Sequence, residues 1–173
     1  PNAEVQVPTP EWAFWMSDER MAAAPEAMKG AFANVRRVFA PVAKDVKMFE
    51  AGKEVAAGIT AVAAPGHTPG HLLFHLTGTP VPVLFTGDAA KNRAELLSLD
   101  VDATEDRAQS QTTLDTLWRL WRAQPGTLLV PGHDLCMVLD AFGHIQYQGE
   151  RQAGIDAWFS ESLAQTTRVN LCP

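Results

Sequence analysis

The sequence predicts a mixed α/β domain in which helices and strands form two packed layers. Two patterns support this prediction. Residues 26–39 repeat apolar side chains at helical spacing, whereas residues 54–64 and 81–87 form short apolar runs that contain or end in glycine or proline. Segments of both kinds occur along a chain of 173 residues, which is about the length of one domain. We therefore expect a single α/β domain over residues 1–173.

The first quarter of the chain predicts a short strand followed by two helices. Residues 3–7 alternate small or apolar side chains with polar ones, as a strand does when one of its faces is exposed. Thr9 is placed to cap a first helix, because Pro10 and an acidic residue follow it. A second helix is expected to begin near residue 26 and to end or kink at Pro41.

From residue 46 onward the pattern is typical of strands. Mostly buried strands are expected over residues 46–50, 54–64, 72–77 and 81–87, which are rich in Val, Leu, Ile and Phe. Residues 91–101 match neither the helical nor the strand pattern clearly. The middle of the chain therefore predicts most of the sheet.

The last third of the chain predicts two helices and one strand. Asp102 and Glu105 have the spacing of a capping box, and the helix that follows them stops at the Pro125-Gly126 pair. Residues 127–130 predict one more buried strand. Residues 150–165 have the apolar spacing of a final helix.

The composition excludes several functional classes. Hydrophobic residues make up 46% of the chain and charged residues 20%, which favours a packed core over disorder. The net charge of −6 opposes binding to phosphates, so we expect no nucleic-acid partner. No apolar run approaches the roughly 18 residues of a membrane helix. We therefore expect no membrane partner either. Cys136 and Cys172 are too few for a disulfide framework or a CxxC zinc site.

Three of the predicted strands end in the same way. In each case a glycine closes the strand, and the next residue is a potential metal ligand: His67, Asp88 or His133. Glycine permits a sharp turn and leaves room for a ligand at the edge of a sheet. Imidazole nitrogen and carboxylate oxygen suit zinc and similar divalent ions. One such pair is more often an ordinary turn, but three with the same pattern indicate a shared metal site.

The same segments resemble the last three metal-binding motifs of the metallo-β-lactamase-fold hydrolases, and they occur in the same order. They are PGHTPGH at 65–71, FTGDA at 85–89 and VPGHD at 130–134. The opening segment PNAEVQVPTPEWAFW is similar to methyl parathion hydrolase-like and lactonase-like branches, and DAAKNRAELL and PGHDLCMVLD are similar to lactonase-like members. The resemblance covers about residues 1–160. It implies an αββα sandwich with a two-metal centre, most often of zinc, although other divalent metals also fit.

The resemblance assigns a role to each of the three ligand candidates. His67 would bind one metal ion, and His133 would bind the second. Asp88 would bridge both ions, which makes it the catalytic candidate as well as a ligand. The implied cofactor is therefore zinc, with two divalent ions in the complete protein.

Three further residues are weaker candidates for orienting the site or contacting substrate. His71 lies four residues after His67, and we favour a structural role for it, hydrogen-bonded to a loop. Asn92 closely follows Asp88 and could contact substrate. His144 could line a substrate pocket, and an exposed loop position is at least as consistent with its sequence.

The activity that the resemblance implies is hydrolysis. A metal-bound hydroxide would attack a small-molecule substrate, namely an ester, a lactone or a related compound, with acyl-homoserine-lactonase-like chemistry first. Organophosphate hydrolysis, glyoxalase II-like thioester hydrolysis and β-lactam hydrolysis are alternatives within the class. The last ranks low, because subclass B1 lactamases carry Cys where this chain has Asp88. The alternative from a different class is a non-catalytic fragment or remnant that binds a partner chain.

The chain departs from the family pattern at one motif. HxHxDH, which in the family precedes the PGHT histidine, is absent, and residues 1–66 contain no histidine. The sequence also starts at Pro1 without an initiator methionine. We therefore expect an incomplete domain, about the C-terminal half to two-thirds of the fold, that joins a missing N-terminal segment or further copies of itself. The localisation is left open, with the cytoplasm slightly favoured over the periplasm or secretion.

Overall fold

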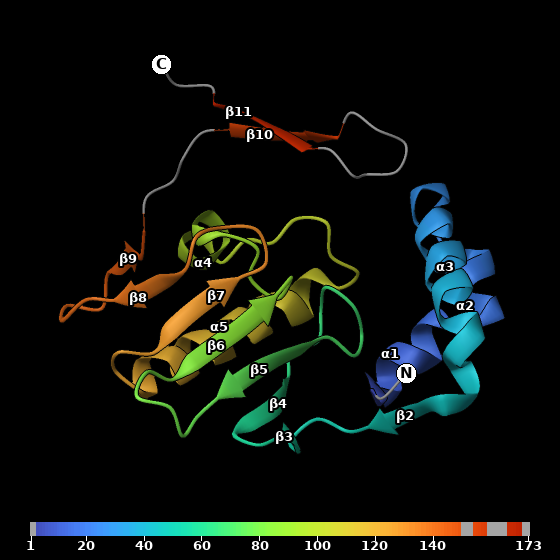
Figure 1. Ribbon diagram of the computed structural model, residues 1–173, viewed down its shortest axis with the longest axis horizontal. Helices are drawn as coiled ribbons and strands as arrows, with labels where there is room; N and C mark the ends of the chain where they lie inside the picture. The colour runs from blue at the N-terminus through green and yellow to red at the C-terminus, as the bar shows by residue number, and fades with distance from the viewer. Residues whose placement is uncertain (1–2, 150–153, 159–165, 171–173) are drawn as a thin grey trace.

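The computed structural model describes residues 3–149, 154–158 and 166–170. Its centre is a seven-stranded sheet with the strand order β3-β4-β5-β6-β7-β8-β9 (Figure 1). Neighbouring strands run antiparallel except β6 and β7, which run parallel. The strands are β3 (Glu54–Ala56), β4 (Ile59–Ala63), β5 (Leu72–Leu76), β6 (Val83–Gly87), β7 (Leu128–Pro131), β8 (Met137–Leu139) and β9 (Ile145–Tyr147).

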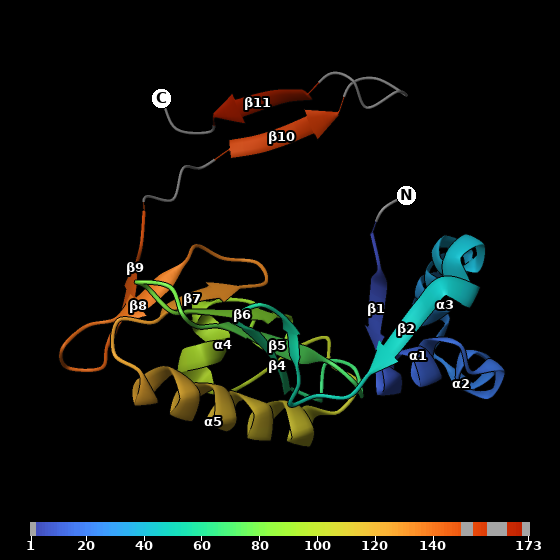
Figure 2. The same ribbon diagram turned by 60° about the horizontal axis from the view of Figure 1, so that its bottom comes forward.

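Two helices connect β6 to β7 and cover one face of the sheet. They are α4 (Arg93–Ser98) and α5 (Arg107–Ala123), and Figure 2 shows both on the same side. Leu73, Leu84 and Leu129 point to this side, and each is 0% exposed. They form the main core together with the apolar face of α5, to which Leu114, Leu117 and Trp121 belong.

The opposite face of the sheet is also apolar, but it is covered less. Phe74, Phe85 and Val130 stand side by side in one row across β5, β6 and β7. All three retain exposed surface, and Phe85 is 40% exposed. No helix of the described residues lies over this face (Figure 2).

A smaller unit precedes the sheet in the chain. Strands β1 (Val5–Pro8) and β2 (Val46–Phe49) pair in parallel. The segment between them folds into α1 (Thr9–Trp15), α2 (Asp18–Ala23), α3 (Glu26–Phe39) and the 3-10 helix η1 (Ala40–Asp45). The aromatic rings of Phe14, Trp15 and Phe32 pack against one another and make a second small core.

Several predicted boundaries differ from the structure. Thr9 is the first residue of α1 rather than its cap, and its hydroxyl donates to the carbonyl of Phe49. Helix α5 is capped by Asp106 rather than Asp102, because the Asp106 carboxylate accepts the N–H of Gln109 at 2.9 Å. The ambiguous segment 91–101 contains α4.

The predicted helix over residues 150–165 is wrong where the structure describes it. Gly154–Trp158 forms β10, which pairs antiparallel with β11 (Thr166–Asn170). The β-branched residues of β11 favour an extended partner, and the ladder satisfies the backbone groups of both strands. Residues 150–153 and 159–165 lie outside the described residues. In the described part of the chain, no helix is both long and apolar enough to cross a membrane.

Candidate metal centre

The loop that carries His67 is held tightly against α5. The hydroxyl of Thr113 donates to the carbonyl of Pro65 at 2.6 Å. Gly66 has a φ of +137°, and a Cβ at this position would lie only 2.3 Å from the Oγ of Ser110. Only glycine permits both this backbone conformation and this close approach.

The same loop is bound from the other side by α1. Glu11 accepts the backbone N–H of Gly70 at 2.8 Å and the indole N–H of Trp15 at 2.9 Å. A Cβ at Gly70 would lie 2.5 Å from the backbone nitrogen of Glu11, so this glycine also permits a close contact. The N-terminal helical unit therefore fixes the position of the His67 loop.

His71 holds the second candidate ligand, Asp88, through its backbone. The Asp88 N–H donates to Nε2 of His71 at 3.1 Å, so that nitrogen carries no proton. Burial lowers the pKa of His71, and the nearby His67 acts in the same direction, which favours the neutral imidazole. The Nδ1 atom of His71 is buried and has no hydrogen-bond partner among the described residues.

The loop that carries His133 is hydrogen-bonded to the segment after Asp88. The N–H of His133 donates to the carbonyl of Lys91 at 2.7 Å, and the N–H of Gly132 donates to that of Ala90 at 3.2 Å. A Cβ at Gly132 would lie 2.6 Å from Oδ1 of Asp88. Glycine at 132 therefore lets the two loops approach each other at the site.

The structure brings His67, Asp88 and His133 together. Oδ2 of Asp88 lies 3.2 Å from Nε2 of His67, and Oδ1 lies 3.1 Å from Nε2 of His133. Each carboxylate oxygen thus faces a different imidazole. The side chain of His67 is 26% exposed and that of His133 is 63% exposed, so the site is more open on the His133 side.

These distances fit ligand atoms that share a metal ion. Two atoms bonded to one tetrahedral zinc at about 2.0–2.1 Å lie about 3.3 Å from each other. Both contacts lie within ion-pair distance, so a single carboxylate faces the two imidazole nitrogens through its two oxygens. The donor set therefore fits a divalent metal that prefers nitrogen and oxygen ligands.

The same geometry divides the three candidate ligands between two positions. Within the described residues, no group of three or more His, Cys, Asp or Glu side chains could hold a metal ion. Asp88 faces the two histidines through different oxygens, so the arrangement is two half-sites that share one carboxylate. Each half-site offers one imidazole and one oxygen, and a four-coordinate ion there needs further ligands.

The weaker candidates lie apart from the three candidate ligands. The side chain of Asn92 caps α4 by accepting the N–H of Glu95 at 3.1 Å. His144 lies in the turn before β9, 75% exposed, with its Nδ1 3.4 Å from Asp140, and it lines a cavity beside α4 and α5. Neither makes a contact with the candidate ligands among the interactions of the described residues.

The importance of Glu11 was not foreseen from the sequence. It contacts the His67 loop across 59 positions of the chain, and no local pattern indicates a contact at that separation. The close approach at Gly132 is the kind of contact that the sequence predicts, because the expected pattern places a glycine before each candidate ligand.

Comparison with known proteins gives a family match over most of the chain. A family model described as the metallo-beta-lactamase superfamily matches residues 4–133. The hydroxyacylglutathione hydrolase of Pseudomonas putida (strain GB-1) is 45% identical over 47 residues, which are 26% of this chain and 18% of that protein.

Solved structures match a larger part of the chain. The hydrolase AbOPH of the beta lactamase superfamily has a TM-score of 0.69 at 18% identity, covering 87% of this chain and 56% of its own. AidC, a dizinc quorum-quenching lactonase, has a TM-score of 0.67 at 15% identity with the same coverage. A probable metal-dependent hydrolase from Staphylococcus aureus has a TM-score of 0.63 at 18% identity, covering 87% of this chain and 54% of its own. At such identities the likeness establishes the fold, and this chain spans slightly more than half of each structure.

Proposed function

Because the chain belongs to the metallo-beta-lactamase superfamily, we propose that it is the part of a metal-dependent hydrolase that carries the later ligands. The observation that carries this proposal is the position of Asp88, with one carboxylate oxygen facing His67 and the other facing His133. A carboxylate in this position can serve two cations at once. The proposed cofactor is zinc, with two divalent ions in the complete protein.

The proposed substrate is an ester or a lactone, with a lactone first. The likeness to a quorum-quenching lactonase supports the lactone, and the short match to a hydroxyacylglutathione hydrolase keeps thioesters as a second substrate class. When bound, a divalent metal lowers the pKa of a water molecule and polarises the electrophilic centre.

The residues of this chain have distinct tasks in that function. Asp88 supplies a carboxylate for cations, and the imidazole rings of His67 and His133 supply nitrogen ligands. His71 accepts the backbone N–H of Asp88 and so orients the aspartate. Because His133 is the more exposed ligand, we propose that substrate approaches from its side.

The first test is metal content. Asp88→Ala removes the shared carboxylate, so zinc bound per chain, measured by elemental mass spectrometry after dialysis, should fall at least about tenfold at limiting zinc. Asp88→Cys should retain part of the zinc, because a thiolate is also a zinc ligand.

Asp45→Ala is the matched control, because Asp45 is an exposed aspartate of η1, away from the candidate ligands. It should bind as much zinc as the unchanged chain. Equal zinc in the Asp88→Ala variant and the control would contradict the proposed role of Asp88.

The second test is a substrate panel. It contains an N-acyl homoserine lactone, an aryl ester, a hydroxyacyl thioester, an organophosphate triester and a β-lactam, each assayed with zinc present. The chain is assayed alone and mixed with a segment of the same fold that carries HxHxDH. We expect lactone turnover in the mixture to exceed turnover of the other substrates, and to be lost in the Asp88→Ala variant. Faster turnover of a different substrate would replace the lactone, and no turnover in any mixture would contradict hydrolysis.

A non-catalytic fragment that binds a partner chain is the second candidate function. The open apolar row of Phe74, Phe85 and Val130 favours it, as does the need of each half-site for more ligands. This candidate predicts stable association with a chain of the same fold, without turnover in the mixture. The same panel therefore separates the two functions.

A further inference from the structure

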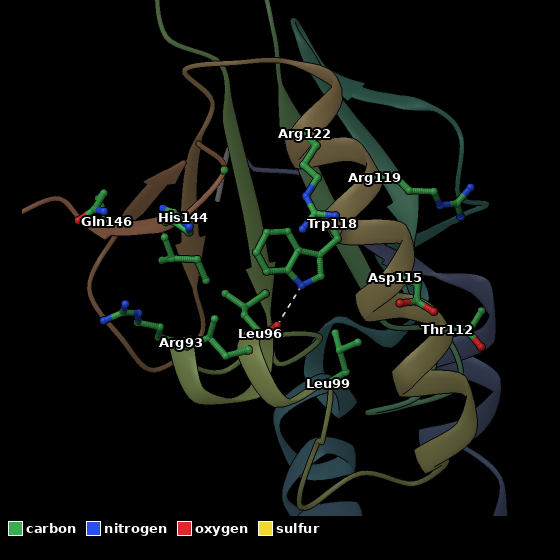
Figure 3. Close-up of a pocket in the computed structure, with 13 residues that line it drawn as sticks. Arg93, Leu96, Leu99, Thr112, Asp115, Trp118, Arg119, Arg122, His144 and Gln146 are labelled. Carbon is green, nitrogen blue, oxygen red and sulfur yellow. Dashed lines mark hydrogen bonds between the residues drawn. The ribbon is translucent and has the colours of Figure 1, made fainter. Parts of the chain in front are cut away.

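A cavity lies on the helix-covered side of the sheet, bounded by α4, α5 and the residues that lead into β9 (Figure 3). Its volume is about 1020 Å³, at the upper end of the range for small-molecule sites. None of the three candidate metal ligands lines it. It is therefore a separate concave site within the described part of the chain.

One part of the cavity wall is apolar. Leu96, Leu99 and Ile145 line it together with the ring of Trp118. The indole N–H of Trp118 donates to the carbonyl of Leu96 at 2.9 Å, so its polar atom is already satisfied and the ring offers an apolar surface. Leu97 also lines the cavity and is 61% exposed. Leu99 is 37% exposed, so an apolar ligand would remove surface of Leu97 and Leu99 from water, whereas Leu96 and Ile145 are already buried.

The other part of the wall is cationic. Arg93, Arg119 and Arg122 line the cavity, whereas Asp115 is the one carboxylate among its lining residues in the described chain. None of these three arginines forms an ion pair within the described residues. The protein carries a net charge of −6, so this grouping of positive charge runs against its overall charge.

Two of the guanidinium groups are held in place by aromatic rings. The guanidinium of Arg122 lies over the ring of Trp118, 4.4 Å from its centre, and that of Arg93 lies 5.2 Å from the centre of the Tyr147 ring. Asp134 accepts the hydroxyl of Tyr147 at 3.0 Å and the backbone N–H of Arg93 at 3.1 Å. This wall of the cavity is therefore ordered by contacts within the protein before any ligand binds.

We propose that this cavity binds an aliphatic carboxylate, a single apolar chain with one anionic head. The chain would lie against Leu97, Leu99 and Trp118, and the carboxylate would pair with the guanidinium of Arg122, which lies beside this apolar wall. The side chain of Arg119 points away from Arg122 in Figure 3 and donates to the hydroxyl of Thr116 at 2.9 Å, so it adds positive charge to the cavity wall without facing Arg122. A guanidinium recognises a carboxylate through paired N–H donors, and the adjacent apolar surface selects a ligand with a chain. The proposal does not depend on the proposed hydrolase function.

The test is equilibrium dialysis of radiolabelled decanoate against the full chain. We expect saturable binding of one decanoate per chain. Decanol lacks the charge and acetate lacks the chain, so each should bind at least about tenfold more weakly. Acetate binding as tightly as decanoate would overturn the apolar part of the proposal, and decanol binding as tightly would overturn the anionic part.

A charge-matched pair of variants locates the site. Arg119→Glu with Arg122→Glu should weaken decanoate binding at least about tenfold, because it replaces both cations with anions. Arg20→Glu with Arg37→Glu makes the same change of net charge on α2 and α3, and should leave binding unchanged. Leu97→Glu, at an exposed position, should also weaken decanoate binding. This variant replaces the double variant in the test if circular dichroism shows that the double variant is unfolded. Binding that is equal in the unchanged chain and in a folded variant of this wall would place decanoate elsewhere and overturn the proposal.

Discussion

Both faces of the seven-stranded sheet carry large apolar side chains, but the two faces have different surroundings. On β6, Leu84 points toward α5 and is 0% exposed, whereas the next residue, Phe85, points the other way and is 40% exposed. On β7, Leu129 and Val130 repeat this difference between a buried and a partly exposed side chain. One strand therefore contributes to two faces, of which the described helices cover one.

This difference indicates that the strands have the sequence of a sheet that is covered on both faces. A strand with one face in water alternates apolar and polar residues, whereas a strand buried on both faces is a continuous apolar run. The β6 run, VLF, is of the second kind. Leaving a few hundred Å² of such a surface in water costs several kcal/mol at roughly 25 cal/mol per Å². The open face is therefore where we propose that a second layer packs.

Truncation of neighbouring residues on β6 gives the largest expected effect. Leu84→Ala should lower the free energy of unfolding by about 2–5 kcal/mol, because it leaves a cavity between the sheet and α5. Phe85→Ala removes a larger side chain, but from a partly exposed position, so its effect should be below about 1 kcal/mol. Urea unfolding of both variants and the unchanged chain measures the difference.

Equal losses of stability in the two variants would contradict the difference in burial between the two faces. A loss of several kcal/mol in the Phe85→Ala variant would mean that the open face is covered in solution. The measurement should then be repeated at several protein concentrations, because a covering second copy makes stability depend on concentration.

The second prediction concerns what covers the open face. An exposed apolar row at the centre of a sheet favours association, so the chain alone should form oligomers in analytical ultracentrifugation. Phe85→Lys places a charge in this row and should raise the dissociation constant about tenfold or more. Val38→Lys is the matched control, since Val38 is an exposed apolar residue of α3, 53% exposed.

The outcome also separates the proposed partners. If a segment with HxHxDH completes the fold, adding it should dissociate the oligomer and form a complex of defined mass. A chain that is monomeric at all concentrations and unfolds cooperatively would contradict the need for any second layer.

The sequence predicted the fold and the family better than it predicted the contacts of the site. The metallo-β-lactamase resemblance and the expectation of a partial αββα fold are confirmed by the family match and by structures of which this chain spans slightly more than half. His67, Asp88 and His133 could be named as candidates because each follows a glycine at a strand end, a signal within a few residues, and the structure places them side by side. The contacts that position their loops, such as that of Glu11 with Gly70, could not be predicted, because they join segments far apart in the chain.

The errors of sequence-based prediction have local causes. Strands β8 and β9 are three residues long, too short for a period of two to stand out. The segment 154–158 has apolar residues at helical spacing, yet it pairs with β11, which no pattern within it indicates. Asp102 and Asp106 are both suitable caps, and only the position of Gln109 in the folded chain separates them.

The smallest expected effect concerns a polar residue on the covered face. His75 pairs with Leu84 and so points to the same side as that leucine, and its Nε2 is buried without a hydrogen-bond partner among the described residues. A buried polar atom without a partner is unfavourable. His75→Leu should therefore raise the free energy of unfolding by up to about 1 kcal/mol. Phe74→Leu, one residue away on the open face, should change it by less than about 0.5 kcal/mol, and both are measured by urea unfolding. A loss of more than about 1 kcal/mol for His75→Leu would mean that this nitrogen is hydrogen-bonded in solution, and that the covered face is less uniformly apolar than its row of leucines indicates.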